Sequence, residues 1–80
     1  MKVTIKFFAH LKEEVGCDEE ELELGRGASV SDLLEILRRT HHVLRGDEKL
    51  LVAVNGVRSK LDQRLAEGDI VALLPPVSGG

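Results

Sequence analysis

The sequence predicts a small α+β domain in which a mixed β-sheet packs against one main helix. Residues Lys2 to Phe8 alternate between polar and apolar side chains, which is typical of a half-buried strand. An apolar stripe with helical spacing begins at Val30, and a second strand-like run extends from Asp69 to Leu74. An amphipathic helix and strands with one apolar face bury their apolar surfaces most economically against each other, so this combination favours an α+β fold.

Length and composition indicate a single soluble domain. Eighty residues with 42% hydrophobic and 31% charged side chains allow one modest core. We expect a folded domain over residues 1–74 and a flexible tail over residues 75–80. No apolar run approaches the ~20 residues of a membrane span, and the start lacks a signal peptide, so we expect a cytoplasmic protein without membrane contact.

Charge and cysteine content exclude several other classes. A net charge of −3 without a basic cluster argues against nucleic acid as a partner. A single cysteine, Cys17, excludes an internal disulfide. Because no cysteines and histidines stand at ligand spacing, we expect no metal site.

The first half of the chain predicts two strands joined through a short helical turn. Ala9 to Val15 favours one helical turn, which ends at Gly16. Glu20 to Leu24 alternates again and is predicted to be the second strand. A connection of about ten residues would allow the two strands to pair antiparallel.

The strongest helix signal begins at Ser29. The Ser29 hydroxyl is placed to accept a hydrogen bond from the backbone N–H of Asp32, as in a capping box, although the short Asp32 side chain should reach back less well than Glu. Arg38 and Arg39 favour the C-terminal end of this helix through its dipole. The apolar stripe has the spacing i, i+3, i+4, i+7 and consists of Val30, Leu33, Leu34 and Leu37.

The second half of the chain predicts two more strands. Leu50 to Val54 is the third strand, followed by the turn signal Asn55-Gly56. Arg58 to Leu65 is expected to be irregular, and the turn Glu67 to Asp69 leads into the final strand. Strand parity and the helical stripe together predict a core of Val3, Ile5, Phe7, Leu22, Leu24, Val30, Leu33, Leu37, Val52, Val54, Leu61, Leu65, Val71 and Leu73.

Few residues before the tail suggest chemistry. Cys17 stands beside acidic residues, which raise rather than lower a thiol pKa. The pair His41-His42 favours solvated or helix-end histidines over half a metal site, and Gly25-Arg26-Gly27 favours a turn over a phosphate loop. The acidic run Asp18 to Glu21 is typical of a solvated face. We therefore expect catalytic groups to belong to partner proteins.

The tail is the most informative segment for function. It consists of Pro75-Pro76-Val77-Ser78-Gly79-Gly80 and follows the last strand directly. Glycine has no side chain, so a Gly79-Gly80 end can enter a channel that excludes every other residue type. The group that such a tail delivers is the carboxylate of Gly80, which predicts a carrier whose terminus is the reactive centre.

Strand parity also predicts a docking surface at the root of the tail. Phe8, Ala53 and Leu74 point away from the helix and should form an exposed apolar patch that continues through Pro75 and Val77. Clustering of apolar side chains at the tail favours a partner-binding surface over scattered surface hydrophobes.

These segments together resemble the small subunits of molybdopterin synthase, which are sulfur carriers with the ubiquitin-like β-grasp fold. The resemblance covers essentially the whole chain and depends on Phe7-Phe8-Ala9, Leu51 to Asn55, Glu67-Gly68-Asp69 and above all Pro75 to Gly80. It implies that an ATP-dependent enzyme adenylates Gly80 and converts it to a thiocarboxylate. It further implies that the carrier joins a large synthase subunit in a heterotetramer and donates sulfur to cyclic pyranopterin monophosphate in molybdenum cofactor biosynthesis, with no cofactor bound to the carrier itself.

Three other functions fit the same pattern. A sulfur carrier for thiamine thiazole synthesis shares the fold and the tail chemistry. A ubiquitin-like modifier would use Gly80 to form isopeptide bonds with lysines. A plain β-grasp interaction module would have an inert tail and keep its function without it.

Overall fold

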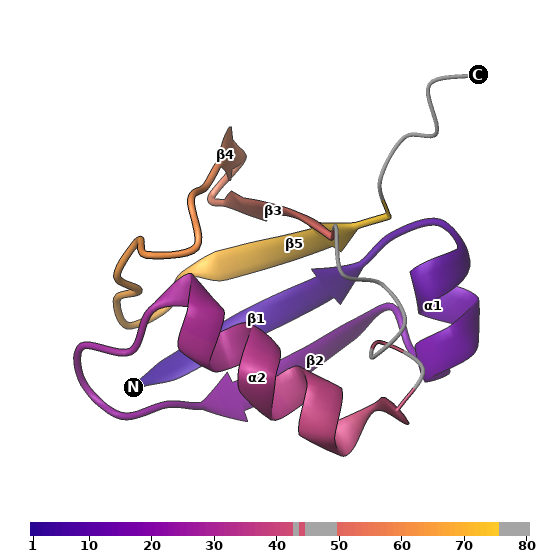
Figure 1. Cartoon of the computed structure of the whole chain (residues 1–80), viewed down its shortest axis with the longest axis horizontal. Helices are drawn as coiled ribbons and strands as arrows, with labels where there is room; N and C mark the ends of the chain where they lie inside the picture. Colours follow the sequence, from indigo (N-terminus) through magenta and orange to yellow (C-terminus); the bar gives the residue numbers. More distant parts are fainter. Residues whose placement is uncertain (43, 45–49, 76–80) are drawn as a thin grey trace.

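The computed structural model describes residues 1–42, 44 and 50–75. Five strands and two helices follow one another along these ranges (Figure 1). Their bounds are β1 Lys2–Phe7, α1 His10–Val15, β2 Glu19–Glu23, α2 Val30–Thr40, β3 Leu51–Val54, β4 Val57–Arg58 and β5 Ile70–Leu74. The α+β class and the order of the main elements agree with the sequence-based prediction.

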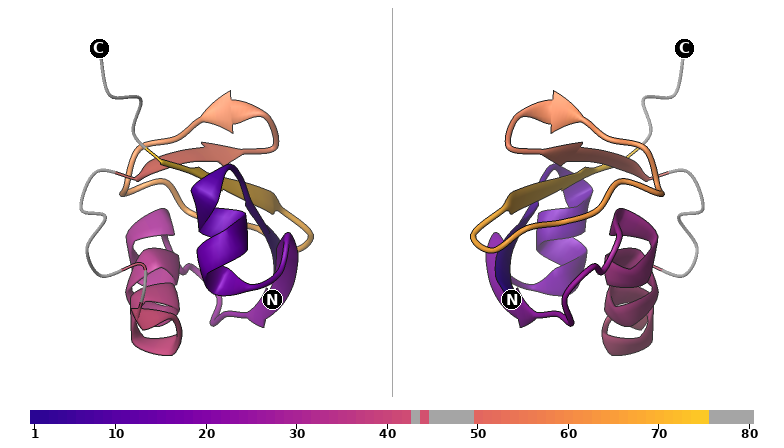
Figure 2. Two further views of the ribbon diagram at one scale, coloured as in Figure 1. Left: turned by 90° about the vertical axis from the view of Figure 1, so that its right-hand side faces the viewer. Right: turned by 90° about the vertical axis from the view of Figure 1, so that its left-hand side faces the viewer.

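The strands form one mixed sheet in the order β2-β1-β5-β3-β4. β1 pairs antiparallel with β2 and parallel with β5, and β3 pairs antiparallel with β5 and with β4. The first and the last strand of the chain are therefore neighbours in the middle of the sheet. Figures 1 and 2 show α2 along one face of this sheet.

The short helix α1 lies at the end of the sheet toward which β1 and β5 both run (Figure 1). Ala9 precedes it with the positive φ of 53°, which is rare for a residue with a side chain. The helix ends at Gly16, as the sequence predicted. Gly16 adopts the left-handed conformation, and its backbone N–H donates to the Lys12 carbonyl at 3.0 Å. Leu11 anchors the helix because its side chain is fully buried.

A complete capping box starts α2. The Ser29 hydroxyl accepts from the Asp32 N–H at 3.2 Å, and the Asp32 carboxylate accepts from the Ser29 N–H at 2.9 Å. The short Asp32 side chain thus reaches back fully, contrary to our expectation. Both hydrogen bonds hold the pKa of Asp32 below its ordinary value of 3.8. The hydrogen bond from the Ser29 backbone has the larger effect, and the one with the Ser29 hydroxyl the smaller.

The core lies between α2 and the sheet and confirms most of the predicted set. One prediction fails, because Leu61 is 58% exposed. Leu22, on the edge strand β2, is partly buried and packs against the core. Leu61 lies in the segment after β4, where its carbonyl accepts from the Ser31 N–H at 2.9 Å while the side chain faces solvent. The fully formed core also contains Leu11, Leu34 and Leu44, which we did not predict.

The β3–β4 hairpin turns through Asn55 and Gly56. Both have positive φ, 51° and 83°, as a type I′ turn requires. Asn55 also ties this turn to the start of β5, because its side-chain amide donates to Asp69 at 2.9 Å and its side-chain oxygen accepts from the Ile70 N–H at 3.0 Å. The strand β4 replaces the irregular structure expected from Arg58 onward, since the turn returns the chain alongside β3 for two residues.

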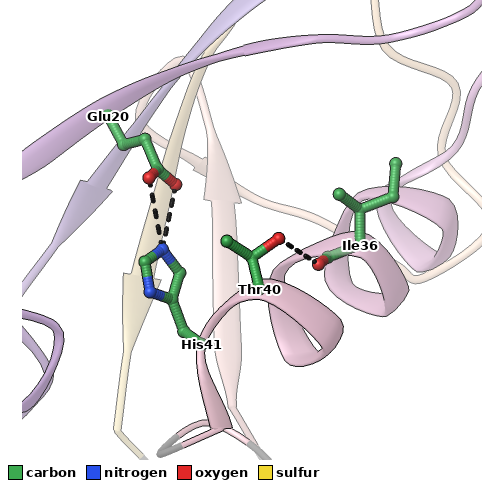
Figure 3. A network of polar contacts seen from close by, with 4 residues as sticks. All are labelled: Glu20, Ile36, Thr40 and His41. Carbon is green, nitrogen blue, oxygen red and sulfur yellow. Dashed lines mark hydrogen bonds and ion pairs between the residues drawn. The ribbon is translucent and has the colours of Figure 1, made fainter.

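A polar contact joins the C-terminal end of α2 to β2 (Figure 3). His41 Nε2 lies 3.1 and 3.2 Å from the two Glu20 carboxylate oxygens. The His41 ring also meets the Phe7 ring edge-on, with centroids 5.9 Å apart. His41 stands at the C-terminal end of α2, as the helix-end interpretation predicted, and its side chain fastens the helix to the sheet.

Candidate functional site

The face of the sheet opposite α2 carries a row of apolar side chains. Those on β3 and β5 point away from the core because each alternates with a buried residue on its own strand, and Phe8 directly follows the buried Phe7 at the end of β1. We call this set the open-face patch; its members are Phe8, Leu51, Ala53, Ile70, Ala72 and Leu74. Phe8 and Ile70 are 44% and 43% exposed, and the other four are half-buried.

Strand pairing places the three sequence-predicted patch residues near one another. Leu74 lies opposite Leu51, and Ala53 lies opposite Ala72, on the antiparallel pair of β5 and β3. Phe8 follows β1 directly, and its backbone N–H donates to the Leu73 carbonyl at 3.1 Å. Phe8, Ala53 and Leu74 therefore share one face, close to the point where β5 ends.

Pro75 marks the root of the tail. It is half-buried and follows Leu74 at the end of β5, beside the patch. The remaining tail residues that the sequence assigned to the site lie outside the described residues: Pro76, Val77, Ser78, Gly79 and Gly80. Since β5 is an inner strand held on both sides, the tail starts from a firmly placed point of the sheet.

Charged side chains border the patch on both sides. One row across the open face runs Glu19, Lys6, Ala72, Ala53, Arg58, as the paired registers of β2, β1, β5, β3 and β4 show. A cation thus stands at each side of the alanine pair. Next to Phe8, an open hollow of about 420 Å³ is lined by Lys6, Phe7, Phe8, Ala9, Lys12, Asp18 and Glu19. An apolar centre with a charged rim is the usual composition of a protein-binding surface.

Sequence reasoning missed half of the patch. Leu51, Ile70 and Ala72 have the same parity as the residues that were identified, so the period-two pattern already contained the signal. Ile70 was the easiest to overlook because it lies at the far end of β5 from the tail, opposite Thr4.

The other residues considered for chemistry lie apart from the patch. Cys17 is exposed, and His41 is engaged by Glu20. Gly27 has φ of 80° and its carbonyl accepts from the Arg64 guanidinium at 2.9 Å, which identifies its segment as a turn. Within residues 1–42, 44 and 50–75, no group of three or more potential metal ligands occurs. None of the helices in these ranges has the length and apolar character to cross a bilayer.

Comparison with known proteins places this geometry in a family. The sequence matches the ThiS family over residues 5–80, which is nearly its whole length. The chain belongs to the ThiS family. This match and the similarity to curated molybdopterin synthase sulfur carrier subunits together confirm the resemblance predicted from the tail and the strand segments.

Individual relatives have the same length and fold. The molybdopterin synthase sulfur carrier subunit of Chlamydomonas reinhardtii is 39% identical, and the match covers 100% of both chains. The crystal structure of SAMP1 from Haloferax volcanii superimposes with a TM-score of 0.88 at 31% identity, again over 100% of both chains. The ubiquitin-like β-grasp fold predicted from the sequence is confirmed by these neighbours.

One similar structure is a complex. The protein–protein complex of subunits 1 and 2 of the molybdopterin-converting factor from Helicobacter pylori contains a chain with a TM-score of 0.71 and 26% identity, covering 100% of both chains. A chain of similar fold and length therefore occurs in a two-subunit complex.

Proposed function

We propose that this protein is the sulfur-carrier subunit of a molybdopterin synthase. The observation that carries the proposal is the position of the root of the tail: Pro75 follows an inner strand, β5, beside an apolar patch on the uncovered face of the sheet. The full-length similarity to curated sulfur carrier subunits supports the same role.

In this proposal the reactive group is the carboxylate of Gly80. A carboxylate is a poor electrophile because its negative charge repels nucleophiles, so an ATP-dependent partner first converts it to an acyl-adenylate and releases pyrophosphate. The terminal sulfur of a partner's persulfide then displaces AMP and forms an acyl disulfide with Gly80. A second thiol of the partner attacks the inner sulfur of this S–S bond, forms a disulfide with it and releases the thiocarboxylate. The thiocarboxylate donates its sulfur to cyclic pyranopterin monophosphate in the active site of the large subunit.

The carrier contributes position rather than catalytic groups. The open-face patch would dock on the large subunit and fix the root of the tail at Pro75. From there, five residues of extended chain span at most about 17 Å, which sets how deep the partner's active site lies. Holding the sulfur within this radius converts an encounter in solution into a reaction within one complex.

A second function is favoured by one comparison. SAMP1, the small archaeal modifier protein 1 of Haloferax volcanii, is similar over the whole chain. Attachment of Gly80 to lysines of other proteins uses the same activated carboxylate. The two functions separate at the acceptor, which is sulfur in the first and a lysine amine in the second.

Removal of the last two residues tests the carrier role. The chain without Gly79 and Gly80 should unfold at nearly the temperature of the full chain, because its sheet and core are complete without them. When the activating enzyme, ATP and a sulfur donor are supplied, the full chain should gain the mass that exchanges one oxygen for sulfur, and the shortened chain should not. The shortened chain should also support no synthase activity with the large subunit.

A matched pair of glycine variants controls for general damage. Gly25→Ala adds a methyl group where nothing lies within 4 Å and φ is not positive, so it should retain full activity. Gly79→Ala adds the same methyl group to the tail and should lower activity sharply if the tail enters a narrow channel. If the shortened chain still supports sulfur transfer at the parent rate, the carrier role is wrong. Conjugates of higher mass in place of the sulfur exchange would instead support the modifier.

A further inference from the structure

A second concave surface lies between α2 and the outer part of the sheet, on the side of β3 away from β5. It is a groove of about 530 Å³, within the range of ligand-binding pockets. Its walls come from α2, from β3 and the residue before it, and from the segment that follows β4. The groove lining includes Leu34, Leu50, Lys60 and Leu61, with Arg58 at the strand edge.

The groove has the dimensions of a short extended segment. Ser31, Leu34 and Arg38 line it at positions i, i+3 and i+7 of α2, so it follows one stripe of the helix for about 10 Å. Three residues of extended chain cover the same length. One end is fixed, because the Ser31 N–H donates to the Leu61 carbonyl at 2.9 Å and joins the two walls.

The chemistry of the groove is apolar inside and cationic at the rim. Leu34 is 3% exposed and belongs to the floor, whereas Leu61 is 58% exposed and stands at the wall. The basic residues of the lining are Arg38, Arg58 and Lys60, against one acidic residue, Asp62. Among the described residues, the ion pairs do not involve Arg58 or Lys60. This local excess of positive charge contrasts with the net charge of −3 of the whole chain.

The exposure of Leu61 needs an explanation that the fold does not provide. Leu61 is held in place by its own backbone hydrogen bond, and because it is 58% exposed beside the groove it gives less packing energy to the isolated chain than a core leucine does. A ligand with apolar side chains would remove it from water. Acidic groups on the same ligand would meet Arg58 and Lys60 at the rim.

We propose that this groove binds an extended acidic segment of a partner protein, three to five residues long, that carries apolar side chains between its carboxylates. The site differs from the open-face patch, since Val52, whose side chain faces the helix, lines the groove. The two surfaces share Leu51, and Arg58 borders both of them. The inference does not depend on sulfur transfer. It predicts a partner that recognises this carrier through a surface other than the root of its tail.

The test uses a synthetic peptide and the ¹⁵N-labelled full chain. The probe is the blocked hexapeptide Asp-Leu-Glu-Val-Asp-Leu, and its control carries Lys in place of each acidic residue. Binding of the acidic peptide should be saturable with a dissociation constant of about 1 mM or below, as expected for a short segment in a groove. The amide signals of Leu34, Lys60 and Leu61 should shift, while those of Phe8 and Ile70 should not.

Variants make the test specific. Lys60→Glu and Leu61→Ser should each weaken binding of the acidic peptide at least fivefold, and neither changes a buried residue. Phe8→Ser, on the open-face patch, should leave that binding unchanged. The proposal is overturned if the acidic peptide fails to saturate, if the Lys peptide binds equally well, or if the shifts lie on the open-face patch.

Discussion

Replacement of Phe8 by serine should weaken binding to the large synthase subunit by about 30-fold. The Phe8 side chain is 44% exposed, and a phenylalanine side chain of about 200 Å² would then offer roughly 90 Å² to a partner. At about 25 cal/mol per Å², burial of this area contributes roughly 2 kcal/mol of binding free energy. Since 1.4 kcal/mol is a factor of ten, the dissociation constant should rise about 30-fold.

The covered half of Phe8 contributes to the fold as well, so the variant should also lose stability. Roughly 110 Å² of covered side chain corresponds to at most about 2–3 kcal/mol, which a domain of this size tolerates if its stability lies in the usual range of roughly 4–12 kcal/mol. Isothermal titration calorimetry at 25 °C, on protein whose folding is verified by circular dichroism, separates the two effects.

A matched variant tests whether position or exposure matters. Val57→Ser removes an apolar side chain that is 69% exposed but lies opposite Val54, away from the open-face patch. It should bind the large subunit with parent affinity. If Phe8→Ser binds as tightly as the parent protein, or if both variants lose affinity equally, the open-face patch is not the docking surface.

Two further predictions concern the fold. Leu33→Ala should lower the free energy of unfolding by about 2–5 kcal/mol because the side chain is fully buried, whereas Leu61→Ala should lower it by less than about 0.5 kcal/mol. Urea titration of both variants measures the difference. Equal losses of stability would show that the burial of the two leucines is misassigned. The carboxylate of Asp32 should stabilise the protein above pH 3.8 and lose that effect as the pH falls through its lowered folded-state pKa. The stability difference between the parent and Asp32→Ala should therefore narrow below pH 3.8 in thermal melts, and a constant difference would contradict this role.

The sequence was most informative where local pattern and tertiary contact coincide. Val3, Ile5 and Phe7 alternate cleanly, and the strand they predict occupies the middle of the sheet with all three side chains buried. The capping box at Ser29 and the hairpin turn at Asn55 were also predictable, because each depends on residues within a few positions of one another. Local physical chemistry therefore accounts for most of the elements.

The failures lie where long-range contacts decide. Leu61 is apolar and was expected in the core, but its side chain is largely exposed. Its backbone carbonyl accepts a hydrogen bond from the start of α2, and this long-range contact holds the segment with the side chain outward. No local sequence pattern predicts the contact of His41 with the Phe7 ring. Its other partner, Glu20, is 21 residues away in the sequence. Leu11 lies in a helix too short to show a stripe, so its burial was not predictable from periodicity.

The position of β5 between β1 and β3 links presentation of the tail to the integrity of the whole domain. Only β5 lies between β1 and β3 in the sheet. Detachment of β5 would therefore leave two separate strand pairs, β1 with β2 and β3 with β4, that share no sheet hydrogen bonds. Partial opening at this strand therefore costs nearly as much as global unfolding. Under the proposed function, a chain with β5 detached would lack the docking face beside Pro75, so folding of the sheet would be a precondition for presenting the tail to a partner.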